Sequence, residues 1–310
     1  MRFIDAAAVH AALPFTHLIP TLRQAFATPC QVPLRHTHAV DERFTSLIMP
    51  AWTARHYGVK VINIAPGNAP LGLPGLHASY LLHDAATGVP LALLDGDAIT
   101  ARRTVAASAL AASYLAREDA QHLLVVGAGR LARLLPAAFS AVRPIRRVTV
   151  WARSAPQATA LAASLREDGF DALAAHDLAT ACAGADIVSC ATLATSPVVQ
   201  GAWLAPGSHL DLIGSFSPQM VEADDACFAG AGVWVDTPEA LQKSGDLLGP
   251  LARGVFRADD VRGTLADLVT GAAQGRRAES ERTVFKAVGT ALEDLAAAVA
   301  VFEAEATRRP

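Results

Sequence analysis

The period of apolar and polar positions changes along the chain and divides it into regions with different predicted elements. Residues 5–13 and the stretch before Thr28 have helical spacing, and Asp5 is placed to cap the first helix. Between Val32 and Leu94, short apolar runs alternate with turns rich in Pro and Gly, which predicts a mostly antiparallel sheet. An Ala-rich helix is expected over residues 101–117.

Strands and helices alternate from residue 121 onward, which is typical of a doubly wound parallel sheet. A last helix is expected from Ala278 to about Thr307, with Val284, Phe285 and Val288 on its apolar face, and it should return to pack on the first domain. The predicted fold class is α/β. It combines a Rossmann-type doubly wound sheet over residues 119–277 with a discontinuous α+β domain formed by residues 1–118 and the C-terminal helix 278–310.

Composition narrows the classes of protein. A hydrophobic fraction of 52% and a charged fraction of 18% supply a large core, so disorder is not expected. The formal net charge of −3 gives no reason to expect nucleic acid or an anionic membrane as a partner. Asp5 interrupts any signal-peptide core, and the charge-free stretch 187–210 is broken by prolines and glycines, so a cytoplasmic protein is expected. The four scattered cysteines have no zinc spacing and are expected to be buried in a reducing compartment.

A glycine loop follows the apolar run 122–126. It reads Gly127-Ala128-Gly129-Arg130-Leu131-Ala132, which is a GxGxxA dinucleotide fingerprint between a predicted strand and a predicted helix. In this motif the first glycine permits a tight turn, the second lets backbone N–H groups approach a pyrophosphate, and the small final residue lets the helix pack closely. Residues 127–131 are therefore predicted to bind a dinucleotide; the alternative is a degenerate loop that binds nothing.

The second strand of this unit, residues 147–151, ends where an acidic residue usually contacts the ribose of NAD. No acid stands there, and Arg153 and Ser154 follow instead. A guanidinium and a hydroxyl suit a 2′-phosphate, so NADP(H) is preferred over NAD(H), which stays possible. The alternative is that Arg153 is simply solvated.

Basic residues outside the fingerprint suggest an anion site. Lys60 lies in an apolar strand, so it either faces solvent or is buried against an anion, because an unpaired buried ammonium is very costly. Arg103 and Thr104 are expected at the start of a helix, where a cation opposes the helix dipole unless an anion bridges them. His36 and His38 lack a third ligand, so no metal site is predicted.

The chain resembles the ornithine cyclodeaminase/mu-crystallin family along nearly its whole length. The matching segments are 58–63 (GVKVIN), 88–96 (GVPLALLDG), 99–108 (ITARRTVAAS), the GxGxxA loop, 212–215 (LIGS) and 283–289 (TVFKAVG) with Glu293 and Asp294. The resemblance implies a homodimer whose discontinuous domain builds the substrate site and the dimer interface. It also implies that Arg35, Lys60 and Arg103 hold the carboxylate of an amino or imino acid. It adds further cofactor-binding candidates, which are Thr104, Thr192, Gly214 and Ser215.

The family's chemistry divides at one position. Cyclodeaminases resemble one another in a Gly-x-Asp segment whose carboxylate handles the distal amine of ornithine, whereas Phe216 occupies that position here. A phenyl ring cannot accept a hydrogen bond from an ammonium, so Phe216 is a predicted substrate-binding residue that disfavours ornithine. A shift of register would let Asp211 or Asp224 supply the acid. The runs 211–224 and 243–246 (KSGD) resemble the family's cyclic ketimine reductases.

The resemblance therefore implies an NAD(P)H-dependent oxidoreductase of proline metabolism. It would transfer hydride to C2 of Δ1-pyrroline-2-carboxylate or Δ1-piperideine-2-carboxylate and so form L-proline or L-pipecolate, with Lys60 and Arg103 as the catalytic residues. Three alternatives stay open. They are an ornithine cyclodeaminase that recycles bound NAD, an amino acid dehydrogenase of the same family, and a non-catalytic NADPH-binding protein similar to mu-crystallin.

Overall fold

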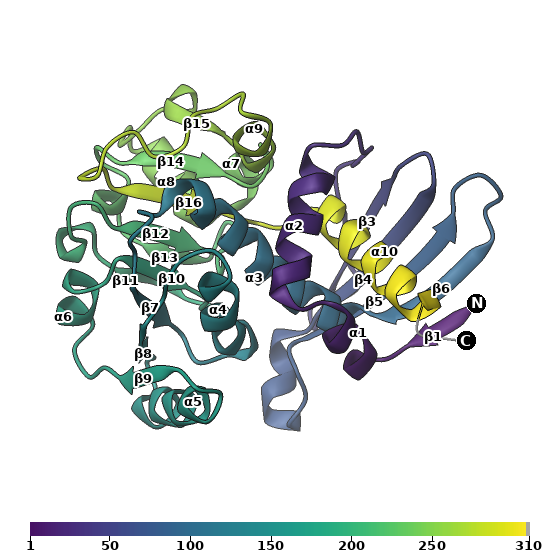
Figure 1. The fold of residues 1–310 in the computed structure, drawn as a ribbon, viewed down its shortest axis with the longest axis horizontal. Coiled ribbons are helices and arrows are strands. Elements are labelled where there is room, and N and C mark those ends of the chain that lie inside the picture. Colours follow the sequence, from purple (N-terminus) through teal and green to yellow (C-terminus); the bar gives the residue numbers. More distant parts are fainter. Residues whose placement is uncertain (308–310) are drawn as a thin grey trace. The chain divides into compact units, whose positions relative to one another are not determined.

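The computed structural model describes residues 1–307, which divide into two compact units. Unit 1 comprises residues 1–106 and the chain from Thr290, and unit 2 comprises Ala107–Gly289 (Figure 1). Unit 1 is discontinuous, as the sequence predicts, but its boundaries lie elsewhere. The first falls inside the helix α3 (Gly96–Leu115) instead of after it, and the second falls just before the last helix.

A six-stranded sheet forms the body of unit 1, with the strand order β1-β6-β5-β4-β3-β2. Its strands are β1 (Arg2–Ile4), β2 (His36–Ala39), β3 (Thr45–Trp52), β4 (His56–Ile64), β5 (Leu76–Asp84) and β6 (Pro90–Asp95), with the 3-10 helix η1 (Pro66–Leu71) after β4. All neighbouring strands pair antiparallel except β1 and β6, which confirms the antiparallel sheet predicted for residues 32–94.

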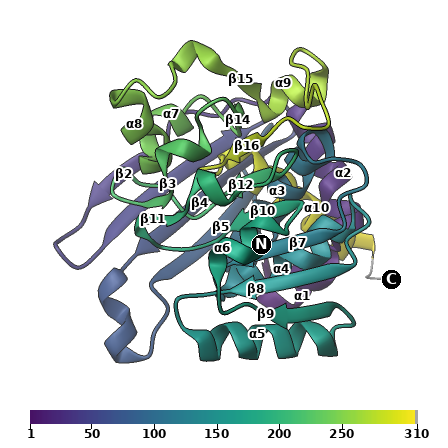
Figure 2. The same cartoon turned by 90° about the vertical axis from the view of Figure 1, so that its left-hand side faces the viewer.

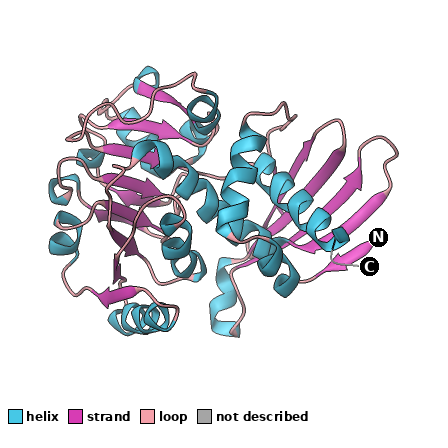
Figure 3. Ribbon diagram, in the orientation of Figure 1, coloured by secondary structure: helices cyan, strands magenta, loops and turns pink. Residues whose placement is uncertain are grey.

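Three helices pack against unit 1's sheet or against one another (Figure 3). They are α1 (Ala6–Ala12), α2 (Phe15–Phe26) and α10 (Ala291–Thr307). Asp5 caps α1 as predicted, because its carboxylate accepts a 2.9 Å hydrogen bond from the N–H of Ala8. Helix α10 contacts β3, β4, β5 and α2, so the last segment of the chain lies over the middle of the sheet.

Unit 2 contains an eight-stranded parallel sheet with the order β15-β14-β16-β12-β10-β7-β8-β9. Its strands are β7 (His122–Val126), β8 (Arg147–Trp151), β9 (Asp171–Ala174), β10 (Ile187–Cys190), β12 (His209–Leu212), β14 (Gly232–Val235), β15 (Val261–Thr264) and β16 (Thr283–Lys286), and β11 (Thr195–Val199) pairs separately with β13 (Val221–Ala223). This arrangement confirms the predicted Rossmann-type sheet.

The helices of unit 2 connect these parallel strands. They are α4 (Arg130–Ser140), α5 (Ala155–Glu167), α6 (Leu178–Ala183), α7 (Ala240–Lys243), α8 (Gly245–Ala252) and α9 (Leu265–Thr270), with three short 3-10 turns, η2 (Gly201–Trp203), η3 (Asp225–Cys227) and η4 (Ala258–Asp260). Figure 2 shows α5 beside β8 and β9, with which it is in contact. Asp177 caps α6 by accepting a 2.7 Å hydrogen bond from the N–H of Thr180.

The last helix predicted from the sequence is wrong in its first part. Residues 283–286 form β16, which pairs with β12 on one side and β14 on the other, and α10 begins only at Ala291. A strand that is buried on both faces reads as a continuous apolar run, and periodicity cannot distinguish such a run from a buried helix. Gly289, with φ +78°, lies between the strand and the helix in a conformation that favours glycine.

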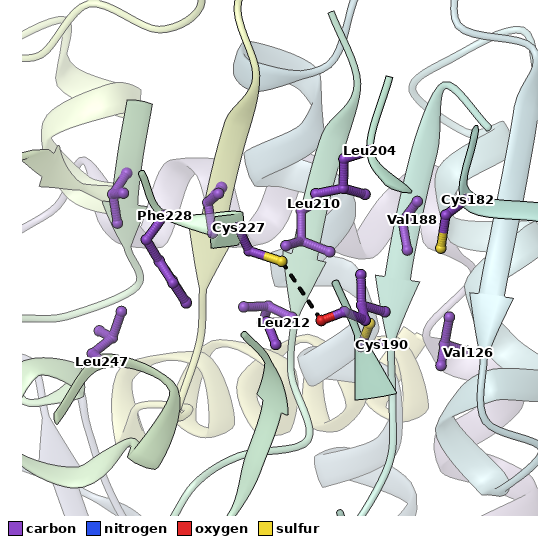
Figure 4. Close-up of a cluster of buried hydrophobic side chains, with 14 of the residues drawn as sticks. Val126, Cys182, Val188, Cys190, Leu204, Leu210, Leu212, Cys227, Phe228 and Leu247 are labelled. Carbon is purple, nitrogen blue, oxygen red and sulfur yellow. Dashed lines mark hydrogen bonds between the residues drawn. The ribbon is translucent and has the colours of Figure 1, made fainter. Parts of the chain in front are cut away.

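The core of unit 2 lies along its parallel strands (Figure 4). It includes Val126, Val188, Leu210 and Leu212, together with Cys182, Cys190 and Cys227. These three cysteines are fully buried free thiols, and Sγ of Cys227 donates to the carbonyl oxygen of Val199 at 3.7 Å. Among the residues described, no helix has both the length and the apolar content needed to cross a bilayer.

Candidate active site

The GxGxxA loop lies where the order of unit 2's strands reverses. The chain runs from β7 outward through β8 to β9 and then returns to β10 on the other side of β7. In open parallel sheets, ligands bind at the carboxyl ends of the strands at this switch point. Gly127, which follows β7, has φ +120°, and a Cβ placed on it would lie 2.6 Å from the carbonyl oxygen of Ala191. Only glycine fits there without displacing the backbone.

Gly129 leaves space at the start of α4. It is the N-cap residue, it provides no side chain to cap the helix, and a Cβ placed on it would meet nothing within 4 Å. Arg130 is exposed, whereas Ala132 is completely buried against the core. The open N–H groups and the helix dipole suit an anion. The residues present therefore fit the diphosphate of a dinucleotide.

The end of β8 presents two polar groups. Arg153 is exposed and has no ion-pair partner within residues 1–307, and Ser154 is the N-cap of α5 but makes no side-chain cap hydrogen bond. Both side chains can therefore meet a ligand on this edge.

The loops after β10 and β12 contain the predicted residues Thr192, Gly214 and Ser215. The N–H groups of Thr192 and Gly214 donate to the carboxylate of Glu222, at 2.8 and 2.7 Å. The hydroxyl of Ser215 is buried and donates to the carbonyl oxygen of Met220, so this side chain is already occupied within the protein. Glu222 was absent from the residues predicted for the site, although its complete burial makes it a central polar group here.

A buried ion-pair cluster lies in unit 1. Lys60 on β4 points toward α10, where its Nζ lies 2.7 Å from Oδ2 of Asp294. Arg103 on α3 donates from Nε to Oδ1 of Asp294 at 2.8 Å and from Nη1 to Oε2 of Glu293 at 2.7 Å. All four side chains are at least 95% buried. Two cations and two carboxylates thus compensate one another away from water.

Arg35 is half-buried and lies close enough to Lys60 for its charge to lower the pKa of that lysine. It adds a third cation to the vicinity of the cluster. The structure therefore brings together the three residues predicted to hold a carboxylate, with two acidic residues that the prediction did not include.

One sequence interpretation of this cluster is wrong. Helix α3 begins at Gly96, so Arg103 lies two turns inside it, and opposition to the helix dipole does not explain its position. Lys60 is buried against an anion, which is one of the two placements the sequence allowed, and the anion that pairs with it in this structure is Asp294 of α10. Thr104 follows Arg103 on α3 and is half-buried.

The GVKVIN segment has a steric reason for its glycine. In the antiparallel register, Lys60 lies opposite Tyr80 of β5. The Tyr80 ring extends over Gly58, where an added Cβ would lie 2.0 Å from the phenol oxygen. Any side chain at position 58 would push the tyrosine out of the buried face that holds Lys60.

Burial lowers the pKa of Lys60 from its usual 10.5 to about 8, although Asp294 opposes this shift. We expect kcat/KM for an anionic substrate to fall as the pH rises through about 8, because neutral Lys60 cannot pair with a carboxylate. Because the pKa of Lys60 is lower in the folded protein than in the unfolded chain, the free energy of unfolding increases as the pH rises from about 8 to 10.5. Comparing the pH profile with that of Lys60→Arg isolates Lys60, because arginine stays charged; a falling limb shared by both proteins would assign it to the substrate or another group.

The sequence profile of the ornithine cyclodeaminase/mu-crystallin family matches residues 5–308. The chain belongs to this family. A Delta(1)-pyrroline-2-carboxylate reductase from Paracoccus denitrificans (strain Pd 1222) is 41% identical over 297 residues, which cover 95% of this chain and 94% of that relative.

Two solved structures of related proteins resemble this chain over nearly their full length. The Delta(1)-pyrroline-2-carboxylate reductase of Thermococcus litoralis, in complex with NADH and L-proline, has a TM-score of 0.95 and 32% identity, covering 99% of this chain and 98% of the other. An archaeal alanine dehydrogenase dimer with bound NAD has a TM-score of 0.94 and 27% identity, covering 100% and 97%.

Asp211 and Asp224, the two acids that a shift of register would bring to position 216, both accept hydrogen bonds within the protein. Asp211 is buried and accepts hydrogen bonds from Ser108 and Ser189, at 2.8 and 2.6 Å. Asp224 accepts from the backbone N–H groups of Gly201 and Cys227. Phe216, which is half-buried, adds no acid.

Proposed function

We propose that this protein reduces a cyclic ketimine carboxylate, Δ1-pyrroline-2-carboxylate or Δ1-piperideine-2-carboxylate, to L-proline or L-pipecolate with NAD(P)H. The proposal rests on the buried cluster formed by Lys60, Arg103, Asp294 and Glu293. The same chain also contains the glycine loop that fits a dinucleotide. The reductase relative at 41% identity and the solved reductase with NADH and L-proline support the choice of substrate.

The substrate's carboxylate would bind Arg35, Lys60 and Arg103. Asp294 and Glu293 pair with Lys60 and Arg103, and the charge of Arg35 also reaches Lys60, so three cationic side chains lie close enough together to attract an anion. The pKa of Asp294 is lowered overall: burial raises it, but Arg103 and Lys60 outweigh that effect. Asp294 therefore stays ionised and fixes the direction of both cationic side chains.

Bound NAD(P)H supplies the hydride that reduces the imine carbon. The protonated ring imine accepts it at C2, the C=N double bond becomes a single bond, and its electron pair passes to the ring nitrogen. An iminium is already electrophilic, so the chain's main tasks are to orient the ring and to balance its charges.

We further propose that NADP(H) is preferred and that NAD(H) is accepted. Arg153 and Ser154 at the end of β8 support the preference, because a guanidinium and a hydroxyl can hold a 2′-phosphate. The solved relatives contain NADH and NAD, which supports acceptance of the second cofactor. A cytoplasmic location is part of the same proposal and can be tested by cell fractionation.

A homodimer is proposed from the sheet of unit 1. On the face opposite Lys60, one apolar row crosses five strands, formed by Phe3, Leu93, Leu81, Val59 and Pro50. Phe3 is 74% exposed, so a second copy of the chain is a suitable partner for this row. The archaeal relative described as a dimer supports this partner. Light scattering should give twice the chain mass of 32.3 kDa, and the mass of one chain would contradict the proposal.

The deciding experiment measures oxidation of NADPH and of NADH with each cyclic ketimine, alongside release of ammonia from ornithine. We expect ketimine-dependent oxidation of both cofactors, with the higher kcat/KM for NADPH. Ammonia release without cofactor oxidation would instead identify a cyclodeaminase. Reduction of pyruvate that requires ammonia would identify an amino acid dehydrogenase, and cofactor binding without any turnover would identify a binding protein.

A further inference from the structure

Glu222 ties two loops of unit 2 together. It lies on β13 and is completely buried. Its Oε1 accepts from both the N–H and the hydroxyl of Thr192, each at 2.8 Å, and its Oε2 accepts from the N–H of Gly214 at 2.7 Å. Thr192 and Gly214 follow β10 and β12, which pair directly through Cys190 and Leu212. One carboxylate thus joins the ends of two adjacent strands.

These two loops adjoin the GxGxxA loop. A Cβ on Gly127 would lie 2.6 Å from the carbonyl oxygen of Ala191 and 3.5 Å from Cγ2 of Thr192. A Cβ on Gly214 would lie 2.1 Å from the carbonyl oxygen of Thr192. The backbones after β7, β10 and β12 therefore form a continuous edge without space for additional side-chain atoms.

Further buried charges hold Glu222 in place. The N–H groups of Glu222 and Ala223 donate to Oδ1 of Asp246, at 2.7 and 3.2 Å, and Oδ2 of Asp246 lies 3.1 Å from Nζ of Lys286 at the end of β16. Glu222, Asp246 and Lys286 are all fully buried. Removing three charged groups from water is costly, and apolar residues would fill the same volume at lower cost. A requirement for fixed loop geometry accounts for their presence.

We propose that Glu222 is a positioning residue that shapes the nicotinamide half of the dinucleotide site, an inference that rests on the proposed function. At a switch point, the strands on the two sides of the first strand follow one another in opposite directions, and a bound dinucleotide extends over both sides. The side of β7 that leads to β8 carries Arg153 and suits the adenosine half, so the nicotinamide half belongs on the side of β10 and β12. Glu222 holds the Thr192 and Gly214 loops there and does not itself contact the ligand.

The variant Glu222→Gln tests this role, because its amide NH2 can face the donors of Thr192 or Gly214 but cannot accept from them. We expect the Kd for NADH, measured by fluorescence titration, to rise about tenfold, since hydrogen bonds to charged groups are among the stronger ones. The KM for NADH should rise while the KM for the ketimine stays unchanged. In the protein without nucleotide, hydrogen exchange at the amides of Thr192 and Gly214 should become faster.

Asp224→Asn is the matched control. Asp224 also accepts hydrogen bonds from two backbone N–H groups, but they belong to Gly201 and Cys227 and not to the loops after β10 and β12. This variant should bind NADH as the unaltered protein does. An equal loss of affinity in both variants would show a general effect of lost carboxylates and would overturn the specific role of Glu222.

Thr192→Val keeps the proposal testable if Glu222→Gln fails to fold. It removes the hydroxyl's 2.8 Å bond to Glu222 together with the longer, 3.3 Å bond that the hydroxyl accepts from the N–H of Ala194, so NADH affinity should fall about threefold, and unchanged affinity would overturn the proposal. If both variants fold, combining them should add little to the effect of Glu222→Gln alone. Failure of the unaltered protein to bind NADH would refute the proposed function, whereas normal binding by folded Glu222→Gln would refute only the positioning role.

Discussion

Replacing Lys60 with methionine should lower kcat/KM for the ketimine by at least about thirtyfold, because truncating one partner of a buried charge pair costs about 2–5 kcal/mol. Methionine fills a similar volume but cannot pair with a carboxylate. NADH affinity should stay within about twofold, because the GxGxxA loop, and not Lys60, is proposed to bind the dinucleotide's diphosphate. Steady-state kinetics and NADH fluorescence titration measure the two quantities.

Arg102→Met is the control for this prediction. Arg102 adjoins Arg103 on α3, but its guanidinium donates to the carbonyl oxygens of Leu13 and His10 and lies over the ring of Phe15. Its loss should change stability more than ketimine turnover. If Lys60→Met lost NADH affinity and kept its turnover of bound substrate, Lys60 would have no role in holding the carboxylate.

Gly129→Asp should raise the Kd for NADH by at least about a hundredfold, because like charges placed together cost several kcal/mol. The fold has room for this change, since φ at Gly129 is −85° and a Cβ there meets nothing within 4 Å. Aspartate is also a favourable N-cap, so the free energy of unfolding should stay within about 0.5 kcal/mol of its original value. Calorimetry and fluorescence titration would separate stability from binding.

Gly127→Ala, in contrast to Gly129→Asp, should lower the stability of the fold. Its Cβ would lie 2.6 Å from a backbone oxygen at a φ of +120°, so we expect destabilisation by more than about 1 kcal/mol. Undiminished NADH binding by a folded Gly129→Asp protein would mean that the diphosphate does not lie at the start of α4.

Local patterns predicted much of unit 2 because its signals are short-range. The strands β7 and β8 coincide with the runs 122–126 and 147–151 identified in the sequence, and the glycine loop follows β7 as expected. The strand β16 was missed because its four residues are all buried and have no alternating pattern. The start of α3 was also missed, although Asp95 caps it through a 2.8 Å bond from the N–H of Ala98, which is a signal readable in the sequence.

The charge cluster could be predicted only in part. Lys60 was recognisable because a lysine in an apolar strand requires an explanation. Arg103 was also singled out from the sequence, and resemblance to the family added Arg35. Their acidic partners were not predicted as such, since Arg103 and Asp294 are separated by 191 positions. Sequence spacing carries no information about which distant side chains meet. Glu222 was missed for the same reason, because its function depends on loops that only the parallel sheet brings together.

The division of unit 1 between the two ends of the chain has a consequence for synthesis. The acidic side chains that compensate Lys60 and Arg103 lie on α10, which is translated after the whole of unit 2. Until that segment emerges, the nascent chain contains both cations without their anions, and burying them would be strongly unfavourable. The segment that forms unit 2 is complete earlier, so it is free to fold before α10 has been translated and unit 1 can form.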